Sequence, residues 1–149
     1  MLPFGDNAFD AAVMALVINL IPEPAKAVAE MVRVVRPGGW VATYMWDIMG
    51  GGFTMEPIRQ ALDEMDVPTP IYGAEICRME SMHGLWERAE LEDVAVRRID
   101  VPLTYDDFDD FWYANTGTPN TISKAIKTFS PADVEKLKVR LRAQLPTKP

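Results

Sequence analysis

Apolar residues gather in two short runs near the start of the chain. Residues Phe9–Leu16 are almost entirely apolar, which is typical of a strand buried on both faces. A helix is the alternative for such a run, but the prolines of Ile21–Pro24 end the segment. Residues Trp40–Trp46 form a second run rich in aromatic and β-branched side chains, which predicts another strand.

The segment between these runs has the period of a helix. Its apolar residues recur every three or four positions and form one stripe, made of Ala27, Val28, Met31, Val32 and Val35. Pro24 suits a first helical turn, and Pro37 predicts an end near Arg36. Gly38-Gly39 supplies the left-handed backbone that a sharp exit needs. Strand, helix and strand in this order predict a βαβ unit with parallel strands and a right-handed crossover.

The rest of the chain predicts further helices and one more strand. Periodicity favours helices over residues 55–65, 77–89, 105–113 and 131–145, the last beginning at a Ser130 cap. The alternating segment Val94–Val101 predicts a third strand. The expected fold class is therefore α/β, with a short, mostly parallel sheet, flanking helices and a helical C-terminal cap. We expect one domain over residues 1–149, with the strands and their helices in 1–104 and the helical cap in 105–149.

Charge and composition narrow the classes of partner. The chain has 22 acidic and 15 basic residues, and its net charge of −7 repels nucleic acid and anionic membranes. The single cysteine, Cys77, can form no internal disulfide. No apolar run approaches the roughly 20 residues of a membrane helix, and Met1-Leu2-Pro3 lacks the basic start of a signal peptide. We expect a cytoplasmic protein that binds neither nucleic acid nor membranes.

Two motifs resemble a known family. Leu2-Pro3-Phe4-x-Asp6-x-x-Phe9-Asp10 is similar to the entry into the fourth strand of class I S-adenosylmethionine-dependent methyltransferases of the ubiquinone/menaquinone-biosynthesis type. Glu30-x-x-Arg33-Val34-Val35-Arg36-Pro37-Gly38-Gly39 resembles the helix and turn that lead into the fifth strand, at matching spacing. Leu85–Ala89 and the segment after it look like the fifth helix and sixth strand. The resemblance covers residues 2 to about 112.

The resemblance implies a partial Rossmann-like fold and S-adenosylmethionine as cofactor. The family's sheet has seven strands in the order 3-2-1-4-5-7-6, with a Gly-rich cofactor turn after its first strand. This chain has no such turn, and Gly50–Gly52 follows a different strand. We therefore expect a truncated C-terminal part that is inactive and binds cofactor weakly or not at all. Its open sheet edges predict a homodimer or a swapped assembly that covers them.

Candidate site residues follow the two predicted strands. The resemblance implies that a segment after the first strand lies beside the cofactor, namely Ala15, Leu16, Val17 and Asn19. Carboxyl ends of parallel strands bind ligands, which predicts a substrate pocket walled by Trp46, Asp47, Phe53, Trp112 and Tyr113. Core packing, a solvated amide and a turn-capping aspartate are the alternatives for these residues.

No catalytic residue and no metal ligand is expected, because the cofactor carries the chemistry of methyl transfer. His83 is interpreted as lacking an acidic or cysteine partner at a productive helical offset. The aspartates between residues 106 and 110 indicate a solvated helix start rather than a metal site.

The favoured function is methyl transfer to a small-molecule acceptor. The alternative is a non-catalytic α/β module for dimerisation or interaction. A nucleotide-binding oxidoreductase half is disfavoured, because no Gly-x-Gly-x-x-Gly follows a strand.

Overall fold

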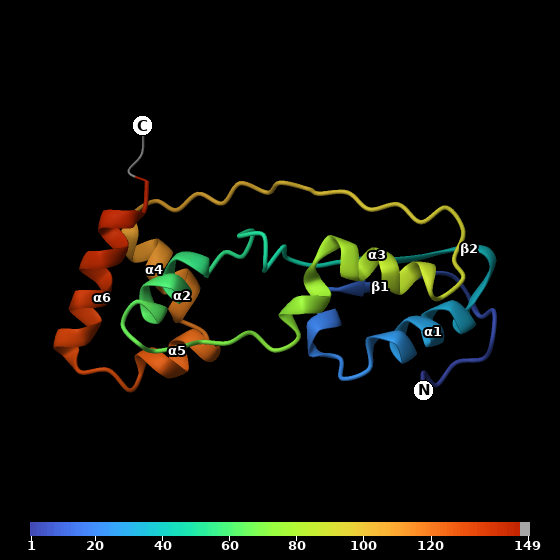
Figure 1. Cartoon of the computed structure of the whole chain (residues 1–149), viewed down its shortest axis with the longest axis horizontal. Helices are drawn as coiled ribbons and strands as arrows, with labels where there is room; N and C mark the ends of the chain where they lie inside the picture. The colour runs from blue at the N-terminus through green and yellow to red at the C-terminus, as the bar shows by residue number, and fades with distance from the viewer. Residues whose placement is uncertain (147–149) are drawn as a thin grey trace. The chain divides into compact units, whose positions relative to one another are not determined.

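The computed structural model describes residues 1–146 and forms two compact units (Figure 1). Unit 1 contains Met1–Gly52 and Tyr72–Ile99. Unit 2 contains Phe53–Ile71 and the described residues from Asp100 onward. Unit 2 therefore combines the predicted helical cap with a segment from the middle of the chain. The expected α/β class is confirmed, with a two-stranded parallel sheet in unit 1.

Unit 1 is built on the predicted βαβ unit. Strand β1 spans Phe9–Ala15, helix α1 spans Pro24–Val34 and strand β2 spans Val35–Tyr44. The two strands run parallel, with Ala11 opposite Trp40 and Ala15 opposite Tyr44. The parallel pairing that the sequence predicts is thus confirmed, although β2 begins earlier than expected.

The predicted exit from the helix at Gly38-Gly39 is wrong, because α1 ends at Val34 and Val35 leaves it in an extended conformation. The register shifts between Phe9 and Ala11, so Gly38 and Gly39 lie within an irregular stretch of β2 rather than before it. Gly38 has a φ of 76°, in the left-handed region that glycine adopts without a Cβ penalty. A Cβ at Gly39 would lie too close to the carbonyl oxygen of Asp10.

One face of the sheet is covered by helices. Met14 of β1 packs in a cluster with residues of α1 and of α3, which spans Met79–Glu87: Val28, Met31, Leu85 and Trp86. Two short 3₁₀ helices, η1 (Ile18–Leu20) and η2 (Ala74–Cys77), complete this unit. The prediction that the first strand is buried on both faces is wrong. Val13 is 63% exposed, because no element of unit 1 packs on the other face.

The predicted third strand over Val94–Val101 is also wrong. These residues belong to no strand, and Val96, Ile99 and Val101 are exposed. The alternating pattern is present, but a strand requires a neighbour for its backbone hydrogen bonds. Among residues 1–146 the sheet consists of β1 and β2 alone, so this segment has no strand beside it.

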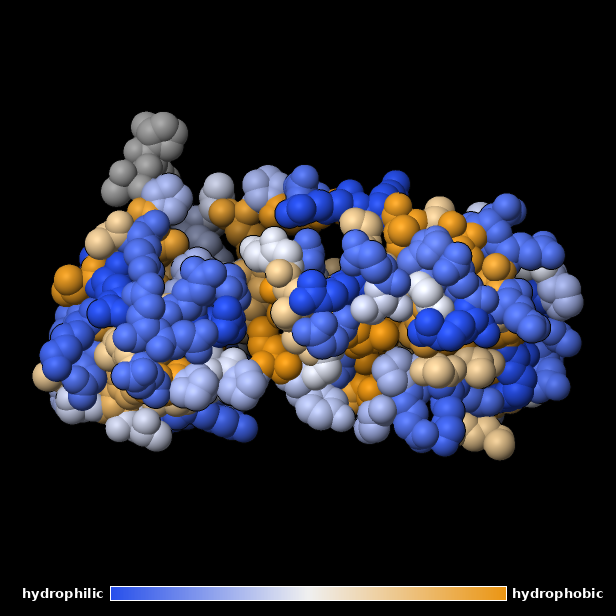
Figure 2. Space-filling model, viewed as in Figure 1, coloured by the Kyte–Doolittle hydropathy of each residue, from blue (hydrophilic) through white to orange (hydrophobic). Residues whose placement is uncertain are grey.

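Unit 2 is helical. It contains α2 (Glu56–Asp63), α4 (Phe108–Thr116), α5 (Thr121–Ile126) and α6 (Pro131–Gln144). Its core consists of Ile58, Ala61, Leu62, Phe111, Ile122, Leu137 and Leu141. Figure 2 shows hydrophilic residues over much of the visible surface of α6. Three helices were expected here, whereas the short helix α5 was not.

The caps of these helices explain where they begin. Helix α4 starts three residues later than expected, because the Asp107 side chain accepts a hydrogen bond from the Asp110 amide at 2.9 Å. Ser130 caps α6 as predicted, with Pro131 in its first turn. No helix within residues 1–146 combines the length and apolar character that a membrane span requires.

Candidate functional site

The carboxyl ends of β1 and β2 lie side by side and form one edge of unit 1. The Leu16 amide donates a hydrogen bond to the Tyr44 carbonyl oxygen at 2.9 Å. The Thr43 hydroxyl donates to the Met14 carbonyl oxygen at 2.7 Å. Ligands of open α/β sheets bind at such an edge, in the crevice beyond the strands. The predicted cofactor segment therefore follows the edge at which this fold class binds ligands.

Leu16 turns the chain away from the strand. Its φ of 54° lies in the left-handed region, which costs a residue with a Cβ about 1–2 kcal/mol. Backbone strain of this kind collects at functional sites, where the surrounding structure maintains it. Leu16 and Val17 are each 40% exposed, so their side chains offer an accessible apolar surface beside the strand ends.

Asn19 connects this turn to a distant segment. It is buried, and its Nδ2 donates to the Tyr72 carbonyl oxygen at 3.1 Å. Gly73 lies against the same residue with a φ of 61°, and a Cβ there would overlap the Asn19 carbonyl oxygen. Asn19 Oδ1 is buried without a hydrogen-bond partner in the described structure. Asn19 thus holds η1 against the start of η2, and its role toward a ligand stays a prediction.

Trp46 and Asp47 follow the end of β2 and are half-buried. Asp47 Oδ1 accepts a hydrogen bond from the Gly50 amide at 2.9 Å, and its backbone oxygen accepts from the Gly52 amide at 2.8 Å. Its Oδ2 lies 3.9 Å from a guanidinium nitrogen of Arg98. The structure therefore shows Asp47 capping a turn, as the alternative interpretation had it, while a contact with substrate stays a prediction.

The other three predicted pocket residues belong to unit 2. Trp112 stacks on Phe108 with ring centroids 6.3 Å apart, and Lys138 Nζ lies 5.1 Å above its ring. Tyr113 is 75% exposed, and Phe53 is half-buried before α2. A pocket shared with Trp46 and Asp47 of unit 1 stays a prediction.

Cys77 is the single cysteine of the chain, and it is buried. Burial raises the pKa of the Cys77 thiol, and its Sγ lies 3.8 Å from the Gly73 carbonyl oxygen. A raised pKa keeps the thiol protonated, so Cys77 is no candidate nucleophile. No group of three or more His, Cys, Asp or Glu side chains within residues 1–146 is arranged to hold a metal ion.

The expectation that His83 lacks an acidic partner is wrong. Its Nδ1 lies 3.4 Å from Glu87 Oε2, one helical turn later on α3. An (i, i+4) spacing brings the two side chains together on the helix surface. Both are substantially exposed, so the pair is a weak surface contact and no catalytic pair.

The two sequence motifs are bound to each other through Arg33. Its Nε donates to Glu30 Oε1 at 2.8 Å, and its Nη1 donates to Asp6 Oδ1 at 2.8 Å. Nη1 also donates to the Phe4 carbonyl oxygen at 2.9 Å, while the Leu2 amide donates to Glu30 at 2.7 Å. Hydrogen bonds from Arg33 and from the Leu2 amide hold the pKa of Glu30 at about 2. We call this cluster the Arg33 clamp; it fixes the path of the chain into β1.

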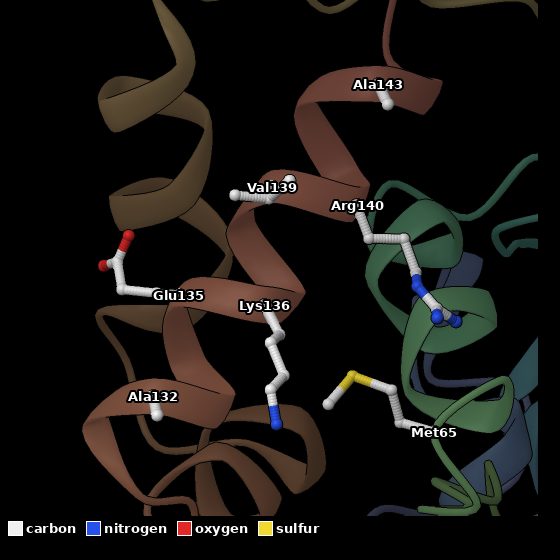
Figure 3. A pocket seen from close by; sticks show the side chains of 7 residues that line it. All are labelled: Met65, Ala132, Glu135, Lys136, Val139, Arg140 and Ala143. Atoms are coloured by element: carbon white, nitrogen blue, oxygen red, sulfur yellow. The ribbon is translucent and has the colours of Figure 1, made fainter.

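An open groove of about 630 Å³ runs along α6 in unit 2 (Figure 3). In Figure 3, Lys136 and Arg140 extend from α6 on the side of Met65, while Glu135 points the other way. Both cations are already paired, Lys136 with Asp133 at 3.1 Å and Arg140 with Glu64 at 2.8 Å. Few polar groups of the groove are left for a ligand, so we do not consider it a site.

The similarity to known proteins includes the two N-terminal motifs. Residues 1–43 match the family described as "Methyltransferase domain". Demethylmenaquinone methyltransferase of Renibacterium salmoninarum is 53% identical over 38 residues, which is 26% of this chain and 16% of that protein. An uncharacterized chloroplastic methyltransferase of Arabidopsis thaliana is 35% identical over 94 residues, 62% of this chain and 23% of that protein.

A third relative carries no functional description. An uncharacterized protein of Mycobacterium tuberculosis is 33% identical over 78 residues, 50% of this chain and 28% of that protein. No solved structure matches the chain. The predicted resemblance to methyltransferases is confirmed, and the chain spans less than a third of each of these relatives.

Proposed function

We propose that this chain, whose residues 1–43 match the methyltransferase domain family, is the C-terminal part of an S-adenosylmethionine-dependent methyltransferase. The observation that carries the proposal is the parallel β1–α1–β2 unit, entered through the Arg33 clamp. The clamp joins the two motifs on which the family resemblance rests. Both strands end at the edge where an α/β sheet binds its ligand.

The residues at this edge supply one wall of a cofactor site. Leu16 and Val17 offer apolar surface, which suits the adenosine or methionine part of S-adenosylmethionine. Ala15 ends β1 beside them, and Asn19 holds the turn in place. A bound cofactor would supply the sulfonium methyl group, and the protein would position donor and acceptor. The chain has no Gly-rich turn of the family's kind, so we propose that it binds the cofactor weakly or not at all by itself.

Two measurements test this proposal. Isothermal titration of the chain with S-adenosylmethionine is expected to show no binding in the micromolar range, and micromolar binding would contradict the predicted weakness. Sequencing the DNA upstream of Met1 is expected to reveal an in-frame segment that encodes a β-strand followed by a Gly-rich turn. A reading frame without such a segment would contradict assignment to an intact methyltransferase.

We propose a small-molecule acceptor and a cytoplasmic location for the intact enzyme. The acceptor pocket would be walled by Trp46, Asp47, Phe53, Trp112 and Tyr113. In an N-terminally extended, active protein, Trp46→Ala is expected to raise KM for the acceptor about tenfold without changing cofactor affinity. The matched control is Trp86→Phe, a conservative change at a buried tryptophan of α3, which is expected to leave both constants unchanged. An unchanged KM for Trp46→Ala would remove Trp46 from the pocket.

A second candidate function is a non-catalytic α/β interaction module. The exposed apolar face of the β1–β2 sheet favours it, because large apolar patches mark sites of association. An extended chain that self-associates but binds no S-adenosylmethionine would favour the module over the enzyme.

A further inference from the structure

The chain crosses between the two units at three places, after Gly52, after Ile71 and after Ile99. We call these places the first, second and third crossing. At each crossing one end of the connection belongs to unit 1, so contacts within unit 1 decide how firmly that end is held. Two polar residues that follow the strands, Asp47 and Asn19, make such contacts.

Asp47 folds the chain into a tight loop just before the first crossing. The Gly50 amide donates a hydrogen bond to Asp47 Oδ1 at 2.9 Å, and the Gly52 amide donates to the Asp47 carbonyl oxygen at 2.8 Å. A Cβ at Gly50 would overlap the Asp47 carboxylate. Gly51 has a φ of 83°, in the left-handed region that favours glycine. The three glycines therefore allow the loop to close around the Asp47 side chain.

The same carboxylate also contacts the end of the third crossing. Asp47 Oδ2 lies 3.9 Å from a guanidinium nitrogen of Arg98, the residue before Ile99. Both side chains are partly exposed, so this ion pair is weaker than the hydrogen bond within the glycine loop. The two oxygens of one side chain thus serve two segments that are far apart in the sequence, Oδ1 the glycine loop and Oδ2 the segment around Arg98.

The second crossing is held by Asn19 instead. Tyr72 is the first residue of unit 1 after this crossing, and its carbonyl oxygen accepts a hydrogen bond from Asn19 Nδ2 at 3.1 Å. Asn19 is buried, and Gly73 packs so closely against it that a Cβ at Gly73 would overlap the Asn19 carbonyl oxygen. The hydrogen bond to Tyr72 does not involve Asp47, so the second crossing is an internal reference for the other two.

We propose that the Asp47 carboxylate is a latch that holds the first and third crossings at the carboxyl ends of the strands, while Asn19 holds the second. Asp47 follows β2 and Asn19 follows β1. The Leu16 amide and the Tyr44 carbonyl oxygen join the two strand ends by a hydrogen bond. Ligands of this fold class bind at the same edge. A ligand group that draws the carboxylate away therefore loosens two connections at once and leaves the second crossing tied.

The latch does not rest on the proposed methyl transfer, so either proposal can fail alone. Hydrogen exchange followed by NMR tests its first part in the chain itself. Asp47→Ala removes the acceptor and is expected to speed exchange of the Gly50 amide about tenfold. Asp47→Asn keeps an oxygen acceptor at the same place, so exchange at Gly50 is expected to stay close to that of the wild type.

Limited proteolysis with mass spectrometry tests the other two crossings. Both Asp47 variants remove the negative charge beside Arg98, so trypsin is expected to cut after Arg97 and Arg98 about twofold faster than in the wild type. Chymotrypsin cleavage after Tyr72 is expected to stay unchanged in both variants, because Asn19 holds that end. Asp47→Asn therefore separates the two parts of the latch, since it keeps the glycine loop and releases Arg98.

A matched control distinguishes the latch from a general loss of stability. Glu23→Ala removes the same charge from a carboxylate of unit 1 that pairs with Lys26 in its own segment, and it is expected to leave exchange and proteolysis unchanged. Asp47 belongs to neither hydrophobic core, so urea denaturation is expected to show equal stability for wild type and variants. Should Asp47→Ala fail to fold, Asp47→Ser replaces it as a milder change.

Several results would overturn the proposal. Exchange at Gly50 that is equally fast in the wild type and in Asp47→Ala means that the loop is not latched. Equal trypsin cleavage in the wild type and in both Asp47 variants separates Arg98 from the latch. Faster cleavage after Tyr72 in the Asp47 variants, or equal effects of Glu23→Ala, would show a general loosening of unit 1 in place of two separate ties.

Discussion

The sheet of unit 1 and the helices of unit 2 bury their apolar side chains to very different degrees. In unit 2, Leu62, Leu137 and Leu141 are all fully buried. In unit 1, helices cover one face of the sheet while Trp40 and Val13 on the other remain largely exposed. A helix has one apolar stripe to bury, whereas a parallel sheet has two faces and needs a layer on each. Unit 2 thus closes over its own core, and unit 1 does not.

The largest expected effect tests whether unit 2 is closed as described. Leu141→Ala removes a fully buried side chain and is expected to cost about 2–5 kcal/mol of unfolding free energy. Val139→Ala, two residues earlier on α6 but 63% exposed, is expected to change it by less than about 0.5 kcal/mol. Urea denaturation followed by circular dichroism measures both. Similar costs for the two variants would show that the core of unit 2 is not packed as described.

A smaller expected effect tests how tightly unit 1 is packed at the edge formed by the carboxyl ends of β1 and β2. Gly73→Ala adds a Cβ that meets the Asn19 carbonyl oxygen and forces a left-handed backbone on alanine, at a cost of about 1–3 kcal/mol. Gly5→Ala is the control, since open space surrounds that position. Thermal unfolding compares the two variants. A Gly73→Ala protein as stable as Gly5→Ala would mean that the edge is loosely held despite its sequence-distant contact.

A cap substitution tests whether unit 2 depends on local signals as well as on its core. The Ser130 hydroxyl accepts a hydrogen bond from the Asp133 amide at 3.2 Å at the start of α6. Ser130→Ala is expected to cost about 1 kcal/mol, while Ser130→Thr retains the hydroxyl and most of the stability. Chemical denaturation distinguishes them. If threonine destabilises as much as alanine, the cap contributes little and burial alone holds the helix.

The smallest effect concerns the Arg33 clamp of unit 1 and appears only in acid. Hydrogen bonds from Arg33 and from the Leu2 amide hold the pKa of Glu30 at about 2 in the folded chain, below the ordinary glutamate value of about 4.5. The unfolded chain therefore binds more protons between these values, and stability falls as pH drops from about 4.5 toward 2. Glu30→Gln is expected to flatten this decline.

The control for this measurement lies at the other end of the same helix. Glu23 pairs with Lys26 at 2.7 Å, and both side chains are largely exposed. Such surface pairs contribute little, so Glu23→Gln is expected to preserve the wild-type acid profile. Denaturant titrations at several pH values between about 2 and 5 provide the comparison. An unchanged slope in Glu30→Gln would mean that the clamp is absent in solution.

The sequence predicted those parts of the fold that depend on local pattern. The β1–α1–β2 unit follows from two apolar runs around a helical stripe, and the Ser130 cap follows from residue type. The pairing of strands and the covering of sheet faces depend on residues far apart in the sequence. Val94–Val101 alternates like a strand but has no strand beside it. The pattern of Phe9–Leu16 predicts burial on both faces, although one face is exposed. Helix α5 escaped prediction because its six residues are too few to establish a period.

The sequence predicted where the candidate site lies better than it predicted which residues contact one another there. Parallel strands must end at one edge, so the location of Leu16 and Asp47 followed from topology. The contact of Asn19 with Tyr72 joins residues 53 positions apart, and no pattern in the sequence pairs them. The residues of the Arg33 clamp belong to the two motifs that resemble the methyltransferase family. The hydrogen bonds of Arg33 to Glu30 and Asp6 give a physical reason why the two motifs occur together.

The parallel pairing of β1 with β2 also affects how the chain emerges from the ribosome. Ala11 lies opposite Trp40 and Ala15 opposite Tyr44, so each residue of β1 must wait for a partner made after α1 is complete. At roughly 5–20 residues per second, translation supplies that partner about 1.5–6 s later. During this interval the largely apolar strand Phe9–Ala15 has no partner strand, so the sheet forms only after α1 has been made.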